Sequence, residues 1–175
     1  AGGHGFGKLG DEYIYHNAFI DNCHCMDGCD HGSAFNMYKA LGWYENLSFT
    51  GKMQSVPWSH LIFDPRYSDI VDIYEGGYMH SRGVFRSEQN SCMNNNIPYY
   101  STISRESIVK RIKRYAGETY SFDDFVKNDK REAGNVTRST GRSGSVGNVN
   151  SGMHQHAPVI HRGNPLNMSK VRKHR

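Results

Sequence analysis

The sequence lacks any run of 18 consecutive apolar residues, so none of its 175 residues is predicted to form a transmembrane helix. It also lacks a charged stretch followed by an apolar one near its first residue, so no signal peptide is predicted within it. Cysteine and proline are scarce, with four and five residues. Aromatic residues reach 12%, however, which excludes a fully disordered chain. The length fits a single domain.

Charge is unevenly divided along the chain. Residues 130–175 contain nine Lys and Arg residues and one acid, whereas residues 1–129 contain 12 Lys and Arg residues and 16 acids. Residues 130–175 also have no aromatic residue and are rich in Gly, Ser and Asn, so they cannot bury enough apolar surface to offset the entropy cost of ordering. We therefore predict a globular domain in residues 1–129 and a basic, flexible tail in residues 130–175.

Glycines surround a histidine and an aspartate close to the first residue. His4 and Asp11 are seven residues apart, with Gly7 and Gly10 between them. In one class of zinc peptidases a helix carries two His and a Glu, and a glycine, often at positive φ, then turns the chain so that a third ligand reaches the metal. His4 and Asp11 fit the second half of such a motif. A His and an Asp near glycines are also common in ordinary loops.

Several short motifs follow one another along residues 3–129. They are Gly3–Gly7 with Leu9, Asp11–Tyr13, Val56–His60, Tyr74–Tyr78, Gly83–Ser87, Ser91–Asn95, and Ser104–Glu106 with Lys110–Ile112. In this set and order they resemble the IgA peptidase family of zinc metallopeptidases, in the form found in Bacteroidetes. Together the motifs are specific, whereas any one of them alone would be a weak signal.

The resemblance implies an α+β fold of the zincin or metzincin type, of which this chain holds the C-terminal portion. Helices and loops are expected around a Met-turn, with few short strands. The resemblance also implies a catalytic zinc and the hydrolysis of peptide bonds. By the same likeness, His4 is the second zinc-binding His, Asp11 is the third ligand, and Met93 is the methionine of the turn beneath the metal. Gly7 and Gly10 support the turn between the two ligands.

The first His and the catalytic Glu of the family motif have no counterpart here and are expected to precede Ala1. In metallopeptidases that Glu accepts a proton from the zinc-bound water. The site also needs a hydrogen-bond donor for the substrate carbonyl and the oxyanion. Tyr78, His80 and Arg86 are the candidates, although an ordinary surface turn explains Tyr78 equally well. His60, beside Trp58, is predicted to be a packed histidine.

The cysteines fall into one cluster and one distant residue. Cys23, Cys25 and Cys29 lie close together, and Cys92 directly precedes Met93. Their C-x-C-x-x-x-C spacing is not that of common zinc sites, so disulfides or buried thiols are alternatives to a structural zinc. An exported peptidase favours disulfides, and a bridge from Cys92 to the 23–29 segment would brace the site. This bridge is a hypothesis.

Three acids in the same region, Asp21, Asp27 and Asp30, suggest a calcium loop. Their spacing matches no EF-hand, so a solvated acidic loop is the preferred interpretation.

Hydrophobic periodicity predicts the main elements. We expect a short amphipathic helix over residues 34–44 and a buried run at 61–63 that ends at Asp64-Pro65. A strand is expected over residues 69–74, ended by a turn at 75–77. A helix with an outward basic face, which includes Arg105, is expected from Ser104 to Tyr115 and ends at Gly117. Ser121 is expected to cap a second helix.

The sequence thus favours part of a secreted, cell-surface or periplasmic zinc metallopeptidase that acts on a protein or peptide. The alternative is a non-catalytic, zincin-like binding module that recognises protein or glycan. Nucleic-acid binding by the basic tail is disfavoured because the tail has no aromatic residue for base stacking.

Overall fold

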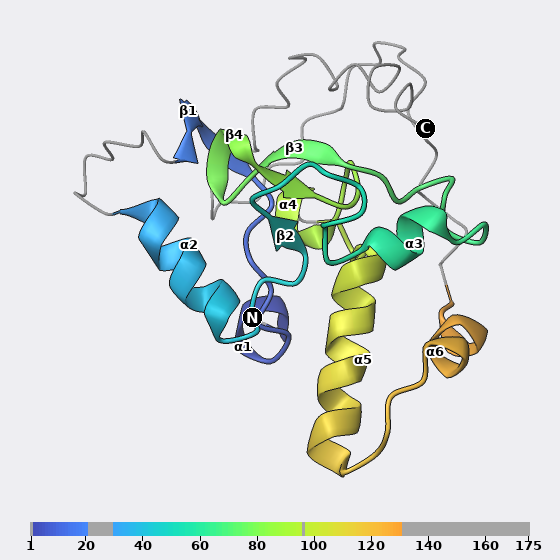
Figure 1. The fold of residues 1–175 in the computed structure, drawn as a ribbon. Coiled ribbons are helices and arrows are strands. Elements are labelled where there is room, and N and C mark those ends of the chain that lie inside the picture. The colour runs from blue at the N-terminus through green and yellow to red at the C-terminus, as the bar shows by residue number, and fades with distance from the viewer. Residues whose placement is uncertain (1, 21–29, 96, 131–175) are drawn as a thin grey trace.

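The computed structural model describes residues 2–20, 30–95 and 97–130 (Figure 1). These residues form a mixed α/β structure with a small open sheet. The helices are α1 (Gly2–Gly5), α2 (His31–Ala40), α3 (Ser59–Phe63), α4 (Cys92–Asn95), α5 (Thr102–Ala116) and α6 (Phe122–Asn128). The strands are β1 (Ile14–Phe19), β2 (Leu47–Ser48), β3 (Tyr74–Gly77) and β4 (Met79–Arg86). None of the helices in the described ranges is long and apolar enough to span a bilayer.

Strand β4 is the centre of the sheet, because each of the other three strands pairs with it. Strand β1 runs parallel to β4, and β2 and β3 run antiparallel to it. Parallel neighbours require a crossover, which here includes α2. Figure 1 shows α2 on one side of the sheet and α3 with α6 on the other.

The predicted strand over residues 69–74 is shifted in the structure. Strand β3 starts at Tyr74 and includes Gly76 and Gly77, so the predicted turn at 75–77 is wrong. The chain turns instead at Tyr78 and Met79, which adopt φ values of 47° and 67°. Gly76 is needed inside the strand because a Cβ there would lie 2.4 Å from Cδ1 of Ile14. Gly76 thus allows Ile14 of β1 to approach β3 closely.

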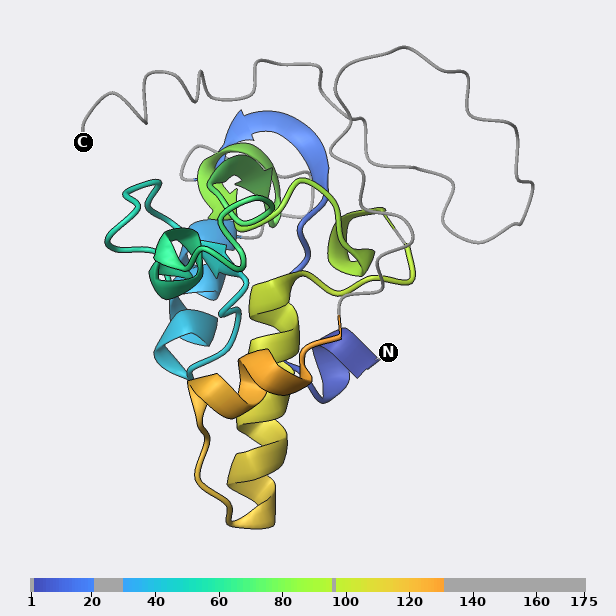
Figure 2. The ribbon, with the colours of Figure 1, turned by 90° about the vertical axis from the view of Figure 1, so that its right-hand side faces the viewer.

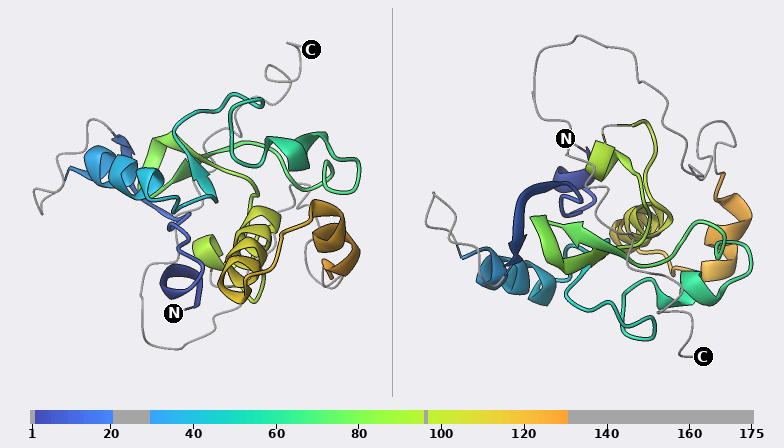
Figure 3. Two further views of the ribbon diagram at one scale, coloured as in Figure 1. Left: turned by 60° about the horizontal axis from the view of Figure 1, so that its bottom comes forward. Right: turned by 90° about the horizontal axis from the view of Figure 1, so that it is seen from above.

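Two apolar cores stabilise the structure. The larger core joins α3, α5, α6 and the segment between α3 and β3; its buried residues are Val56, Trp58, Leu61, Ile62, Tyr67, Val71, Ile73, Ile103 and Phe125. The smaller core lies between α2 and the sheet; its buried residues are Ile20, Phe35, Leu47, Tyr78 and Val84. Figure 3 shows α2 beside the sheet and, in its right panel, α5 viewed along its axis.

The helix predicted over residues 34–44 is present with changed limits, and the predicted buried run at 61–63 lies in helix α3. Helix α2 begins at His31, where Asp30 caps it by accepting a hydrogen bond from the Ser33 amide (2.9 Å). Leu41, which is within the predicted range of 34–44, lies beyond the helix end and is exposed. Helix α3 ends before Asp64-Pro65 as predicted. Phe63 was expected to be buried but is exposed, because only Leu61 and Ile62 face the core.

The two C-terminal helices confirm the predicted end and cap. Gly117 ends α5 in the left-handed conformation (φ 70°), and the Ser121 hydroxyl accepts a hydrogen bond from the Asp124 amide at the start of α6. Helix α5 starts two residues earlier than predicted, with Ser101 as its N-cap. Ser104, the predicted first residue, is buried in the first turn of α5, and its hydroxyl lies 2.7 Å from that of Ser101.

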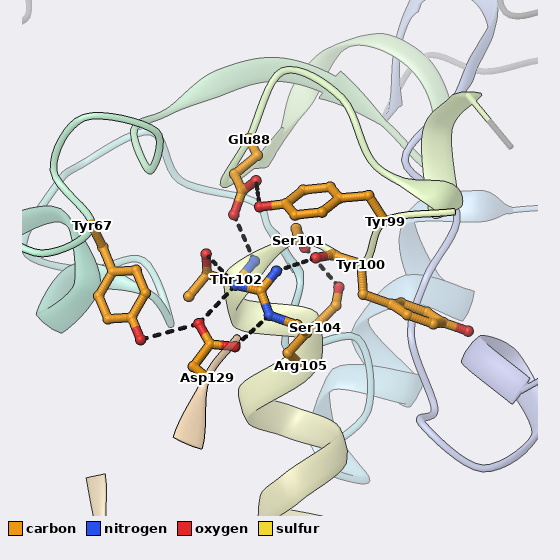
Figure 4. A network of polar contacts seen from close by, with 9 residues as sticks. All are labelled: Tyr67, Glu88, Tyr99, Tyr100, Ser101, Thr102, Ser104, Arg105 and Asp129. Atoms are coloured by element: carbon orange, nitrogen blue, oxygen red, sulfur yellow. Dashed lines mark hydrogen bonds and ion pairs between the residues drawn. The ribbon is translucent and has the colours of Figure 1, made fainter. Parts of the chain in front are cut away.

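The prediction that the basic residues of α5 all face outward is wrong for Arg105. Its Nε and Nη2 atoms lie 2.6 and 2.8 Å from the two carboxylate oxygens of Asp129, just beyond α6 (Figure 4). The hydroxyl of Tyr67 also donates to Asp129 (3.1 Å). Glu88 accepts from the amide of Thr102 (2.6 Å) and from the hydroxyl of Tyr99 (2.7 Å). This network ties the start of α5 to the end of α6 and to the preceding loop.

The packing of the larger core can be tested by comparing a buried and an exposed residue of helix α5. Replacing Ile103, which is fully buried, by Ala should lower the free energy of unfolding by about 2–5 kcal/mol, because a cavity forms next to Trp58 and Leu61. Ile112→Ala is the matched control, since that side chain is 49% exposed on the same helix and should change stability by less than about 1 kcal/mol. Urea unfolding of both variants measures the difference, and equal losses would contradict the packing described.

Candidate functional site

His4 and Asp11 meet at the start of the chain. The Nε2 atom of His4 in α1 lies 2.7 Å from Oδ1 of Asp11, and the two side chains are 56% and 26% exposed. Figure 2 shows α1 beside α5. The structure thus brings together, at the surface, the two residues that the sequence analysis assigned to a metal.

The turn that joins these residues depends on close packing of glycine. A Cβ on Gly7 would lie 2.8 Å from the carbonyl oxygen of Gly3, and a Cβ on Gly10 would lie 2.6 Å from Cδ1 of Leu47. The positive φ expected at a glycine occurs instead at Lys8, with φ 53°. Gly7 and Gly10 therefore support the turn by allowing close approach of the chain, as residues without a side chain.

Asp11 is held by both its backbone and its carboxylate. Its carbonyl accepts a hydrogen bond from the Tyr78 amide (2.8 Å), which fixes Asp11 against the start of β4. The hydroxyl of Tyr13 hydrogen-bonds to the Asp11 side chain, and burial together with the Asp11 charge raises the pKa of Tyr13. The phenol is therefore a stable neutral donor that orients the carboxylate.

The next residue, Glu12, is a fully buried carboxylic acid. Its Oε1 accepts from Nδ2 of Asn46 (2.9 Å), and its Oε2 accepts from the hydroxyl of Ser91 (2.5 Å). Asn46 also exchanges two hydrogen bonds with the backbone of Gly10 (2.8 and 2.9 Å). Burial raises the pKa of Glu12 to about 7, against the lowering effect of these hydrogen bonds and of Arg86. Sequence reasoning missed this network, although the adjacent acids Asp11-Glu12 are visible in the motif.

Met93 lies in α4, and its side chain lies against α1. Its Sδ would be 2.7 Å from a Cβ on Gly3, the residue before His4. Its carbonyl accepts from the Glu12 amide (2.9 Å), and its amide donates to the Ser91 hydroxyl (3.1 Å). Met93 thus contacts Gly3 and Glu12, the residues next to His4 and Asp11 in the chain, and its role beneath a metal stays a prediction.

The structure gives the candidate catalytic donors other contacts. The Tyr78 ring is buried in the smaller core against Phe35 and Tyr44. The Nη1 atom of Arg86 donates to the carbonyls of Glu75 (3.1 Å) and Gly76 (2.6 Å), so this side chain braces β3 against β4. His80 is fully buried on β4. These positions do not support a role as oxyanion donors at the His4–Asp11 pair.

The cysteine and acid predictions fall mostly outside the described residues. Cys23, Cys25, Cys29, Asp21 and Asp27 lie there, as do residues 131–175 of the predicted tail. Asp30 caps α2.

Cys92 carries a free thiol, and the predicted partners of its bridge, in the 23–29 segment, lie outside the described residues. The thiol makes a hydrogen bond with Tyr100, and burial raises its pKa to about 11. A thiol with so high a pKa is unreactive near neutral pH.

Glu12 makes the stability of the fold depend on pH. Its pKa is about 7 when folded and near 4.5 when unfolded, so the folded chain holds a proton that the unfolded chain has lost between these values. The free energy of unfolding should therefore fall by about 3 kcal/mol as pH rises from 4.5 to 7.

Glu12→Gln removes this titration and should flatten the dependence by that amount. Urea unfolding at pH 5 and pH 8 measures it, with Glu118→Gln as the exposed control. An unchanged slope in the Glu12 variant would contradict the assignment.

His4 and Asp11 are therefore two possible metal ligands. Within residues 2–20, 30–95 and 97–130, no three His, Cys, Asp or Glu side chains are arranged to hold an ion. No model of a known protein family matches this chain, and no curated protein matches it. The functional argument therefore depends on the chemistry of the residues themselves.

Proposed function

We propose that this chain carries part of the catalytic site of a zinc-dependent metalloendopeptidase, with His4 and Asp11 as two of the zinc ligands. The observation that supports this most is the 2.7 Å approach of His4 Nε2 to Asp11 Oδ1. A ring nitrogen and a carboxylate oxygen, seven residues apart, are brought together at the surface. The parent protein would act on a protein or peptide, in a secreted, cell-surface or periplasmic setting.

The donor chemistry fits part of a zinc site. Zinc is bound in proteins by imidazole nitrogen and carboxylate oxygen, and a catalytic zinc takes three protein ligands. His4 and Asp11 supply one of each kind. By the family resemblance, the third ligand and the general base are a His and a Glu that precede Ala1. When bound, zinc polarises the scissile carbonyl and lowers the pKa of a bound water.

The residues around the pair have the character of a supporting shell. Tyr13 donates to the Asp11 carboxylate and so fixes its orientation. Glu12 links the Asp11 segment to Ser91 and, through its amide, to the carbonyl of Met93. Partners of this kind orient metal ligands and tune their affinity, typically by 10–100-fold in metal binding.

A second candidate function is that of a zincin-like binding module without catalysis. It is favoured by the direct ion pair between His4 and Asp11, which satisfies both side chains without a metal. Tyr15 and Phe19 on β1 are also exposed, and aromatic rings of this kind suit contact with a glycan or a protein.

The sequence encoded immediately before the Ala1 codon separates the two functions. The peptidase proposal predicts a His-Glu pair just before Ala1, about one helical turn before His4. A different sequence there favours the binding module.

The metal site itself is tested by substitution, in the protein that includes the residues preceding Ala1. His4→Ala should weaken zinc binding by at least about 100-fold and abolish zinc-dependent peptide cleavage, because a direct ligand is lost. Asp11→Ala should weaken zinc binding more than it weakens folding. Three measurements check these outcomes: the zinc content by mass spectrometry, the Kd for zinc by calorimetry, and the cleavage of a peptide library.

His60→Gln is the matched control for these variants. His60 Nε2 lies 2.8 Å from Oε2 of Glu106, and Gln keeps a hydrogen bond to that carboxylate. This variant should retain zinc and activity. Zinc-dependent cleavage that survives His4→Ala would refute the proposed role of His4.

A further inference from the structure

Three histidines from separate elements gather on the α2 side of the sheet. His16 lies on β1 and is paired in register with His80 on β4. His31 is the first residue of α2. The ring centres of His80 and His16 are 5.6 Å apart, and those of His80 and His31 are 5.1 Å apart. Neither His16 nor His31 belongs to the His4–Asp11 pair.

The hydrogen bonding of the His80 ring is typical of a histidine that binds a metal. Its Nδ1 lies 2.5 Å from the carbonyl oxygen of Tyr78, which only accepts, so Nδ1 carries the hydrogen. The other nitrogen, Nε2, then holds a lone pair. Metal-binding histidines almost always donate their second nitrogen to a carbonyl or carboxylate in this manner, which fixes the tautomer.

The Nε2 atom of His80 is also a buried polar atom without a hydrogen-bond partner among the described residues. The residue is 0% exposed. Burial, with contributions from His31 and His16, lowers the pKa of His80, so the ring is neutral at physiological pH. A neutral, buried imidazole with a vacant lone pair beside two further imidazoles is better explained by a ligand than by packing alone.

The ring separations suit a shared ion. Ligating nitrogens lie about 2.0–2.1 Å from zinc, so the ring centres of two imidazoles on one tetrahedral ion are about 5 Å apart. The observed values are 5.1 and 5.6 Å. Because no three donor atoms of the described residues already converge, the exposed ring of His16 has to turn toward His80. Such a rotation of an exposed imidazole is easy.

We propose that His16, His31 and His80 form a binding site for a transition-metal dication of the zinc or nickel class, separate from the His4–Asp11 pair. Three imidazoles are a donor set that suits zinc, nickel and copper. The ion would connect β1, β4 and α2, whose mutual packing otherwise depends on the smaller core. This proposal does not depend on the peptidase function.

The test uses Ni²⁺ alone as the probe, on the full chain with His4→Ala and Asp11→Ala so that the other pair cannot bind. An ion that bridges three elements binds the folded state only. At about 100 times its Kd, Ni²⁺ should therefore lower the equilibrium constant of unfolding about 100-fold. Urea unfolding with and without Ni²⁺ measures this. No stabilisation by Ni²⁺ would overturn the proposal.

Two variants of the site sharpen the result. His16→Ala removes an exposed ligand with little risk to folding, and should raise the Kd for Ni²⁺ at least about 100-fold. His80→Asn keeps a donor for the Tyr78 carbonyl but lacks the second nitrogen, and should have the same effect. Stabilisation by Ni²⁺ that is unchanged in His16→Ala would contradict the site, whether or not the His80 variant folds.

A control variant changes three histidines that lie outside the proposed site. Joint replacement of His154, His156 and His161 by Gln changes the same residue type outside the proposed site, and should leave the stabilisation by Ni²⁺ intact. If the stabilisation disappears with this variant, the ion binds there and the proposal is wrong.

Discussion

The buried carboxyl of Glu12 is the interaction on which the candidate site depends. Through Asn46 it holds the Gly10 segment, and through Ser91 it holds the turn that carries Met93. The segments it joins lie 34 and 79 residues away along the chain. An uncharged acid suits this position because two hydrogen bonds cannot fully replace the hydration of a carboxylate. The surface pair is therefore built on an interior polar contact and not on a long regular element.

The end and cap of the two C-terminal helices could be predicted from local sequence, whereas the central strand β4 and its neighbour β1 were not predicted. Gly117 and Ser121 act as a helix end and a helix cap because their preferences are local. Strand β3 could not be predicted, because Gly76 and Gly77 are typical of turns, and the approach of Ile14 that requires a glycine at position 76 depends on the tertiary fold. Arg105 was predicted to face solvent because its partner, Asp129, is 24 residues further along the chain.

Some features of the candidate site could likewise be predicted from the sequence, and others could not. The meeting of His4 and Asp11 followed from the spacing of residues around glycines, because a tight turn brings close neighbours together. The contacts of Arg86 and the burial of Tyr78 did not follow, because they depend on how β3 folds onto β4. The grouping of His16, His31 and His80 is also invisible in the sequence, since it arises from strand register and from the place where α2 begins.

The pairing of Arg105 with Asp129 also makes residue 129 part of the packed structure. Asp129 lies just past the last helix, yet its carboxylate meets a largely buried guanidinium and the hydroxyl of Tyr67. A chain cut before this residue would leave a buried cation without its counter-ion, at the start of the longest helix. The smallest piece that can keep this packing therefore extends through residue 129, and whatever is joined to it begins from a point anchored against α5.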